Sequence, residues 1–245
     1  EIEAFDDYVN YLISTIDNDI SKIKILVDTA NGAACKTAVS VFNKLNANFD
    51  MINNNPDGIN INKNAGSTHI DVLKEKVVSG KYDIGIAYDG DADRTILVDE
   101  NGNEIDGDYI IAIAGSELKR EGKLTNNTLV GTIMTNLGFI KFCEEKDINF
   151  VATSVGDKYV LREMIEKGYV LGGEQSGHII FKEYANTGDG QLTSLQILSI
   201  MSKTNKSLSE LSKVMKKYPQ VLINANVSKK GKELYQMRKR KKKKK

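Results

Sequence analysis

Short apolar runs alternate with amphipathic segments along most of the chain. The runs are rich in β-branched residues and predict strands at 24–27, 48–52, 82–88, 95–98, 128–131, 149–152 and 178–181. Segments with apolar residues three or four positions apart predict helices at 2–20, 33–45, 70–78, 109–119, 137–146, 158–166 and 191–201. This pattern runs twice, over about 100 residues each time, which predicts an α/β fold of two tandem domains, each a mixed sheet flanked by helices.

The turn Asn101-Gly102-Asn103 separates the two runs of this pattern. We therefore expect one domain over residues 1–103 and a second over residues 104–228. Within the first, the polar and Asn-rich stretch Asn53–Thr68 predicts a long loop. Residues 229–245 form a polybasic tail that we interpret as disordered or artificial.

Charge is distributed very unevenly along the 245 residues. The formal net charge is +1, but the final eight residues are all Arg or Lys, leaving 26 basic against 33 acidic residues, a net charge of −7. The body of the protein is therefore acidic and offers no basic face, so we expect no nucleic-acid partner. The hydrophobic content of 40% is that of an ordinary globular protein.

No apolar run reaches the roughly 18 residues of a membrane helix, so we expect no membrane partner. The two cysteines, Cys35 and Cys143, lie in predicted helices far apart in sequence, which suggests neither a disulfide framework nor a thiolate metal site. A reducing, cytoplasmic location fits both observations. The chain starts at Glu1 rather than Met, inside a helical pattern, so we expect that an upstream segment has been removed.

Three carboxylates follow the predicted strand 82–88 at every second position: Asp89, Asp91 and Asp93. Like charges this close repel one another unless a cation lies between them. Oxygen ligands favour a hard cation such as Mg²⁺ or Ca²⁺. Arg94 adds a positive charge beside the metal, where a phosphate would complete the site. A solvated acidic turn is the simpler alternative, but the regular spacing favours a metal site.

A second polar segment, Gly172–His178, contains Glu174, Ser176 and His178 among glycines. Glycines let a backbone approach a ligand closely. A carboxylate and a hydroxyl two positions apart can bracket the adjacent hydroxyls of a sugar ring. An ordinary polar hairpin turn explains the segment equally well from its spacing alone.

Two further turns precede predicted helices. Gly156-Asp157-Lys158 could hold a phosphate on its exposed N–H groups and Lys158, although helix capping alone would explain Asp157. In Thr187-Gly188-Asp189-Gly190, capping of the next helix by Asp189 is the simplest interpretation.

Together these motifs resemble the α-D-phosphohexomutases. The segment Asp89–Arg94 resembles the metal loop of that superfamily, and Gly173–His178 resembles its sugar-recognition loop. The resemblance continues in order through most of the chain, to about Val227, and is greatest to the members that act on glucosamine phosphates. Further matching segments are 28–33, 60–62, 66–69, 131–138, 155–160, 187–190 and 218–221.

The resemblance implies a role for each of these residues. Asp89, Asp91 and Asp93 would hold Mg²⁺, and Arg94 would steady the transferred phosphate. Glu174, Ser176, His178 and Lys158 would bind the substrate, a phosphorylated hexosamine. The superfamily usually has Arg at the position of Lys158, and a lysine cannot bind phosphate bidentately as an arginine can. The implied reaction interconverts glucosamine 6-phosphate and glucosamine 1-phosphate, an amino-sugar precursor of the cell wall, through a phosphoserine and a bisphosphorylated sugar.

The chain resembles only the second and third of the four domains in that superfamily. The nucleophilic Ser-His-Asn-Pro loop of the first domain and the Arg-x-Ser-Gly-Thr clamp of the fourth do not occur in the sequence. The first and fourth domains are therefore expected partners, and we expect this chain alone to be inactive as a mutase.

Other interpretations of the segment Asp89–Arg94, the acidic loop, remain. An EF-hand loop would need Gly where Arg94 stands, and helices rather than strands on either side. A haloacid-dehalogenase-like phosphatase would use Asp89 as its nucleophile. A phosphomannomutase or phosphoglucomutase would share the same motifs, and a non-catalytic binding fragment is also compatible with them.

Overall fold

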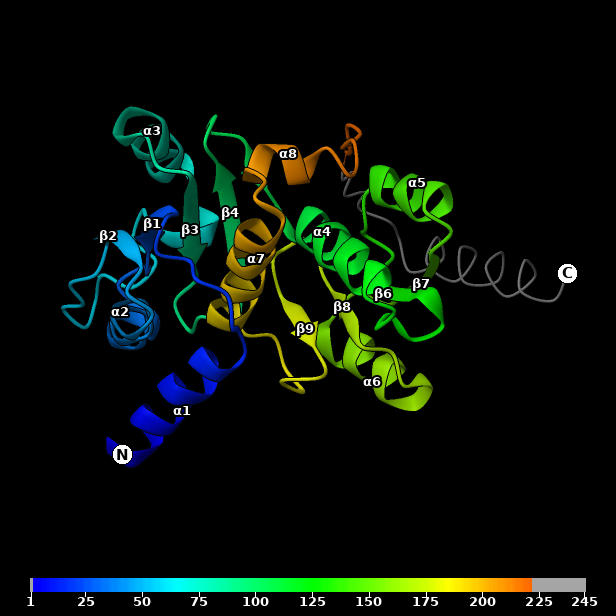
Figure 1. Ribbon diagram of the computed structural model, residues 1–245, viewed down its shortest axis with the longest axis horizontal. Helices are drawn as coiled ribbons and strands as arrows, with labels where there is room; N and C mark the ends of the chain where they lie inside the picture. Colours follow the sequence, from blue (N-terminus) through cyan, green and yellow to red (C-terminus); the bar gives the residue numbers. More distant parts are fainter. Residues whose placement is uncertain (1, 222–245) are drawn as a thin grey trace, which may run out of the picture.

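The computed structural model describes residues 2–221 and contains two mixed β-sheets (Figure 1). The predicted polybasic tail, 229–245, lies outside the described residues. The first sheet has the order β2-β1-β3-β4-β5, and its strands are β1 (Lys24–Asp28), β2 (Asn48–Ile52), β3 (Ile84–Tyr88), β4 (Thr95–Asp99) and β5 (Glu104–Ile105). The second has the order β7-β6-β8-β9, and its strands are β6 (Thr128–Thr132), β7 (Asn149–Thr153), β8 (Leu171–Gly173) and β9 (Ile179–Phe181).

The two sheets are built on one plan. In each, a central strand pairs in parallel with two neighbours, and the next strand along the sheet returns antiparallel. The predicted fold class, two tandem α/β units with mixed sheets, is confirmed. The first sheet also includes β5, so it extends two residues past the predicted boundary at 103, which remains a prediction.

The helices cover both faces of the sheets. They are α1 (Ile2–Ser14), α2 (Ala34–Lys44), α3 (Asp71–Gly80), α4 (Gly107–Arg120), α5 (Leu137–Glu145), α6 (Asp157–Lys167), α7 (Gly190–Thr204) and α8 (Leu208–Ser212), with short 3₁₀ turns at Gly66–Thr68 and Thr125–Asn127. Among the described residues, no helix combines the length and apolarity needed to cross a lipid bilayer.

The first helix is shorter than its sequence pattern predicts. The pattern continues to Ile20, but α1 ends at Ser14. The hydroxyl of Thr15 donates to the carbonyl of Leu12, 2.7 Å away, and satisfies a carbonyl group that a continuing helix would have used. Ile20 is nevertheless buried, in the same core cluster as Val9 and Leu12 of α1.

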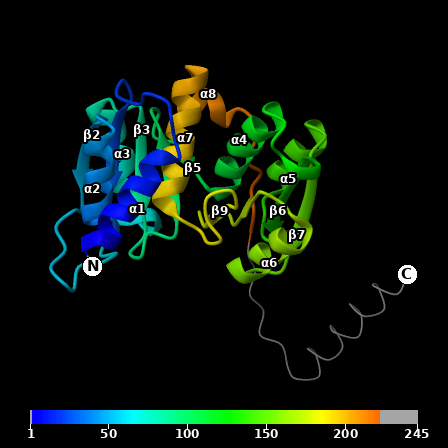
Figure 2. The same cartoon turned by 60° about the horizontal axis from the view of Figure 1, so that its bottom comes forward.

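Alternate residues of each strand face different cores. On β1, Ile25 and Val27 face a large central core, whereas Leu26 faces a small core beneath α3. The second sheet likewise has a small outer core beneath α6. The central core contains side chains of both sheets, and α7 packs against strands of both. Figures 1 and 2 place α7 between the two sheets, so the sheets share one interior.

The N-terminus of α4 carries a buried carboxyl group, that of Asp108, which is 1% exposed. Burial raises its pKa to about 7, against the hydrogen bond that it accepts from the backbone N–H of Asn136. The folded protein therefore binds a proton that the unfolded chain releases near pH 4. This contribution to stability is fully present below pH 4 and is lost as the pH rises through 7.

We therefore expect the free energy of unfolding to fall by about 3 kcal/mol between pH 5 and pH 8 from this group, because the two pH units from 5 to the folded pKa near 7 each cost about 1.4 kcal/mol. Asp108→Asn keeps an oxygen acceptor for Asn136 and should flatten the fall. Urea unfolding at the two pH values measures it, and Asp71→Asn, at a fully solvated carboxylate, serves as the control. An equally steep fall in Asp108→Asn would assign the pH dependence to other groups.

Candidate active site

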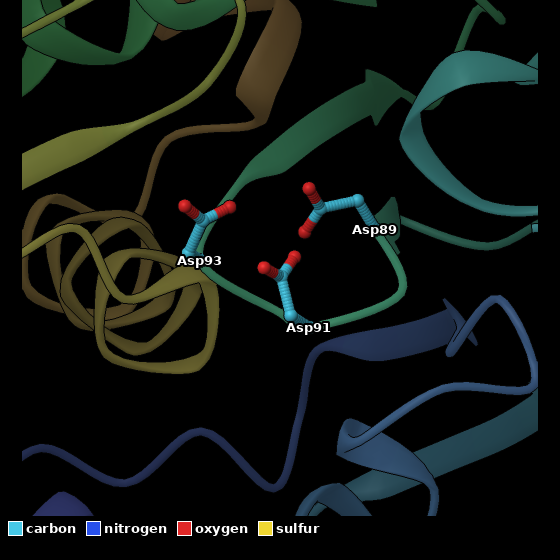
Figure 3. Close-up of side chains that lie close together, drawn as sticks. All are labelled: Asp89, Asp91 and Asp93. Atoms are coloured by element: carbon cyan, nitrogen blue, oxygen red, sulfur yellow. The ribbon is translucent and has the colours of Figure 1, made fainter. Parts of the chain in front are cut away.

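The acidic loop connects β3 to β4, two predicted strands that pair antiparallel as a hairpin. Asp89, Asp91 and Asp93 each offer a carboxylate oxygen, and these oxygens lie within 4.8 Å of one another. Figure 3 shows the three side chains pointing into the same space from one turn of the loop. The flanking strands exclude an EF-hand, which needs a helix on each side.

The electrostatics of the loop favour a bound cation. Burial and, to a lesser extent, the neighbouring charges of Asp93 and Asp91 together raise the pKa of Asp89 to about 6. The Arg94 guanidinium offsets part of this repulsion, since its Nε lies 3.8 Å from Asp89 Oδ2 and 3.6 Å from Asp93 Oδ1. Oxygen donors arranged in this way fit a hard divalent ion such as Mg²⁺.

Backbone contacts hold this loop at the starts of two helices, α2 and α7. On one side, the N–H of Ala33 donates to Gly90 O at 2.8 Å. On the other, the N–H of Gly190 at the start of α7 donates to Ala92 O at 2.9 Å. Ala92 itself has a left-handed backbone, with φ of 61°. The loop is thus fixed in an uncommon conformation by its neighbours.

His178 contacts the metal loop. Its side chain is buried and both ring nitrogens are engaged: Nε2 accepts from the N–H of Gly188 at 3.0 Å, and Nδ1 lies 3.1 Å from Asp93 Oδ2. Since Nε2 is the acceptor, the proton of the neutral ring is on Nδ1, and this N–H donates a hydrogen bond to Asp93. The structure therefore places His178, predicted to bind substrate, against a predicted metal ligand.

The Gly172–His178 segment comprises the end of β8 and the turn that leads to β9, so the hairpin interpretation is correct for its backbone. The side chains in this turn diverge. Ser176 is exposed and lines a cleft of about 810 Å³, which Arg94 also lines. Glu174 instead contacts the turn before α6, where its Oε1 accepts from the N–H of Gly156 at 2.9 Å.

Lys158 does not line that cleft. It lies in the first turn of α6, and its Nζ is 5.1 Å from the centre of the Tyr159 ring. The hydrogen bond between Glu174 and Gly156 nevertheless joins the sugar-recognition loop, Gly173–His178 (the sugar loop), to the turn that carries Lys158. Gly156 lies two residues before Lys158 in that turn. Asp157 is the first residue of α6 and makes no cap, whereas Asp189 caps α7 through the N–H of Leu192, as predicted.

Sequence reasoning missed two charged residues of this cleft. Asp106 and Lys217 line it together with Ser176, yet neither lies in a segment that the sequence singled out. Asp106 precedes a predicted helix, so its position could have indicated a cap, which it is. Lys217 follows the last helix, and nothing in its own identity indicates that the chain returns to the cleft there.

Two family models match the chain. Domain II of phosphoglucomutase/phosphomannomutase, an α/β/α domain, matches residues 6–102, and domain III of the same enzymes matches residues 106–218. The chain therefore belongs to the phosphoglucomutase/phosphomannomutase family, whose second and third domains it comprises. This assignment replaces the dehalogenase-like interpretation.

The curated relatives are phosphoglucosamine mutases. The chain is 54% identical over 236 residues to that of Acetivibrio thermocellus and 53% identical over 233 residues to that of Clostridium novyi. These alignments cover 96% and 95% of this chain, and 53% and 52% of the relatives. The chain thus spans about half the length of the curated relatives it matches.

Solved structures share the fold. A phosphoglucomutase/phosphomannomutase family protein from Burkholderia thailandensis superposes with a TM-score of 0.75 at 24% identity, over 89% of this chain and 47% of that one. N-acetylphosphoglucosamine mutase from Aspergillus fumigatus, solved with GlcNAc-6P and magnesium, superposes with a TM-score of 0.66 at 20% identity, over 86% and 52%.

Proposed function

We propose that this chain supplies the metal and sugar sites of a phosphoglucosamine mutase. The enzyme would interconvert glucosamine 6-phosphate and glucosamine 1-phosphate through a phosphoserine and a bisphosphorylated sugar. The similarity to curated phosphoglucosamine mutases, above 50% over nearly the whole chain, supports this substrate over other hexose phosphates. The observation that carries the proposal is the acidic triad, which lies beside Arg94 at the edge of a cleft that Ser176 also lines.

The phosphoserine and a second phosphate site would come from domains outside this chain, which covers about half of its relatives. Those domains and the phosphorylated hexosamine are the partners that we propose. Two buried cysteines without a disulfide support a reducing compartment, and we propose that the enzyme works in the cytoplasm.

Each residue has a task in this reaction. Asp89, Asp91 and Asp93 would hold Mg²⁺, which neutralises charge on the transferred phosphoryl group. Arg94, tethered by its backbone N–H to Asp89 Oδ1 at 3.2 Å, would present its guanidinium to the same group. Ser176 would bind a ring hydroxyl from the cleft wall, and Glu174 another beside the turn that carries Lys158.

We expect Mg²⁺ to bind this chain weakly, since the phosphoserine oxygen that would complete its coordination lies in another domain. Calorimetric titration should show heat of binding for the wild type and none for Asp91→Ala, which removes one of three ligands. The solvated carboxylate of Asp71 gives the matched control, Asp71→Ala. Equal Mg²⁺ binding by Asp91→Ala would contradict the assignment.

Kinetics of the full-length enzyme test the proposed reaction. A coupled assay with glucosamine 6-phosphate and a catalytic amount of bisphosphate should show turnover that depends on Asp91. Turnover of mannose or glucose phosphates at a higher kcat/KM would instead assign another phosphohexomutase activity.

A further inference from the structure

Asp106 lies where the chain passes from the first sheet to α4. Its carboxylate is almost completely buried, with 3% of the side chain exposed, although it borders the cleft. One oxygen, Oδ1, caps α4 by accepting from the N–H of Tyr109 at 3.3 Å. Helix capping accounts for that oxygen and leaves the other one to be explained.

The second oxygen, Oδ2, joins two segments that are far apart in sequence. It accepts from Gln175 Nε2 at 3.3 Å and from Lys217 Nζ at 2.5 Å. Gln175 lies in the turn between β8 and β9, next to Ser176, and Lys217 lies in the segment after α8. All of these side chains line the same cleft. One buried carboxylate therefore ties together two parts of the cleft wall.

Backbone contacts fix the same turn on the start of α4. The N–H of Gly107 donates to Gln175 O at 3.0 Å. A Cβ at position 107 would overlap the carbonyl oxygen of Glu174, so the turn lies directly on the helix N-terminus. Held in this way, the turn keeps the Ser176 side chain exposed toward the cleft.

We propose that Asp106 is a positioning residue for sugar binding: it fixes Gln175 and Lys217 so that Ser176 meets the sugar ring. This inference rests on the proposed function. Contacts to ring hydroxyls far from the transferred phosphoryl group contribute equally to the ground state and the transition state. Loss of their alignment therefore raises KM and leaves kcat nearly unchanged.

The test uses the full-length enzyme with Asp106→Asn. Asparagine keeps an oxygen for the α4 cap but turns an amide N–H₂ toward Lys217. We expect KM for glucosamine 6-phosphate to rise about tenfold and kcat to change less than threefold. Deuterium uptake of the peptide 172–181 should rise as well. Asp108→Asn is the matched control, because Asp108 lies in the same helical turn, is equally buried and does not contact the sugar loop.

A folded Asp106→Asn enzyme with KM within twofold of wild type and unchanged uptake would overturn the proposal and leave Asp106 as a helix cap. If that variant does not fold, Gln175→Met, which removes only the side-chain amide, should raise KM and uptake in the same direction, and unchanged values would again overturn it. A wild-type enzyme without turnover would count against the proposed function alone, and uptake of 172–181 would then decide the role of Asp106.

Discussion

Glu174→Ala should lower kcat/KM of the full-length enzyme for glucosamine 6-phosphate by about one to two orders of magnitude. A hydrogen bond to a charged group is worth about 1.5–3 kcal/mol, and removing it from the transition state gives this loss. The variant also removes the acceptor for the Gly156 N–H, so the turn that carries Lys158 loses its tie to the sugar loop. Steady-state kinetics measure the effect.

The control for this variant is Glu166→Ala, at an exposed carboxylate near the other end of α6. Unchanged kinetics in Glu174→Ala would make the Gly172–His178 segment a purely structural turn. We expect Mg²⁺ affinity to change little, because the Glu174 carboxylate faces Gly156 rather than the acidic triad.

The sugar-recognition loop, Gly173–His178, and the metal loop, Asp89–Arg94, lie in different halves of the chain. The two loops are in contact: the N–H of Thr95 donates to Gly177 O at 3.1 Å, and His178 contacts Asp93. Substitutions at Gly177 or His178 should therefore disturb both sites.

Gly107→Ala should destabilise the protein by about 3 kcal/mol, at the upper end of the usual cost of overpacking. The added methyl group meets the backbone carbonyl of Glu174, which cannot move aside as a flexible side chain can. The sugar loop must shift or the start of α4 must unwind. Chemical unfolding of the wild type and the variant measures the loss.

Gly115→Ala provides the comparison within the same helix. The three atoms nearest its added methyl group all belong to the side chain of Leu129, the first of them 2.7 Å away, and this side chain can change rotamer. We expect a clearly smaller loss of stability there. Equal losses at both positions would show that the cost comes from crowding along α4 in general, and not from the sugar loop.

Local patterns predicted most of the fold. The β3–β4 hairpin and the acidic loop between its strands follow from alternation and spacing within a few residues. Strand β8 was missed because two of its three residues, Gly172 and Gly173, have no side chain to give a pattern. The short helix α8 was missed as well, although Ser207 and Glu210 form a capping box at its start.

Contacts between distant segments could not be predicted from a single sequence. His178 and Asp93 are 85 positions apart, and Asp106 and Lys217 are 111 apart. Only the packing of the two sheets against α4 and α7 brings these pairs together. The motifs around Asp93 and His178 each suggested a polar site. Nothing in the sequence, however, indicates that these two side chains contact each other.

The position of α7 has a consequence for how the protein unfolds. Because this helix packs on both sheets within one interior, neither half can lose its structure without exposing apolar surface of the other. Melting should therefore be cooperative across both halves, with one calorimetric transition. For the same reason, residues 1–103 expressed alone would lack the helix that covers β3 and β4, and would be prone to aggregate.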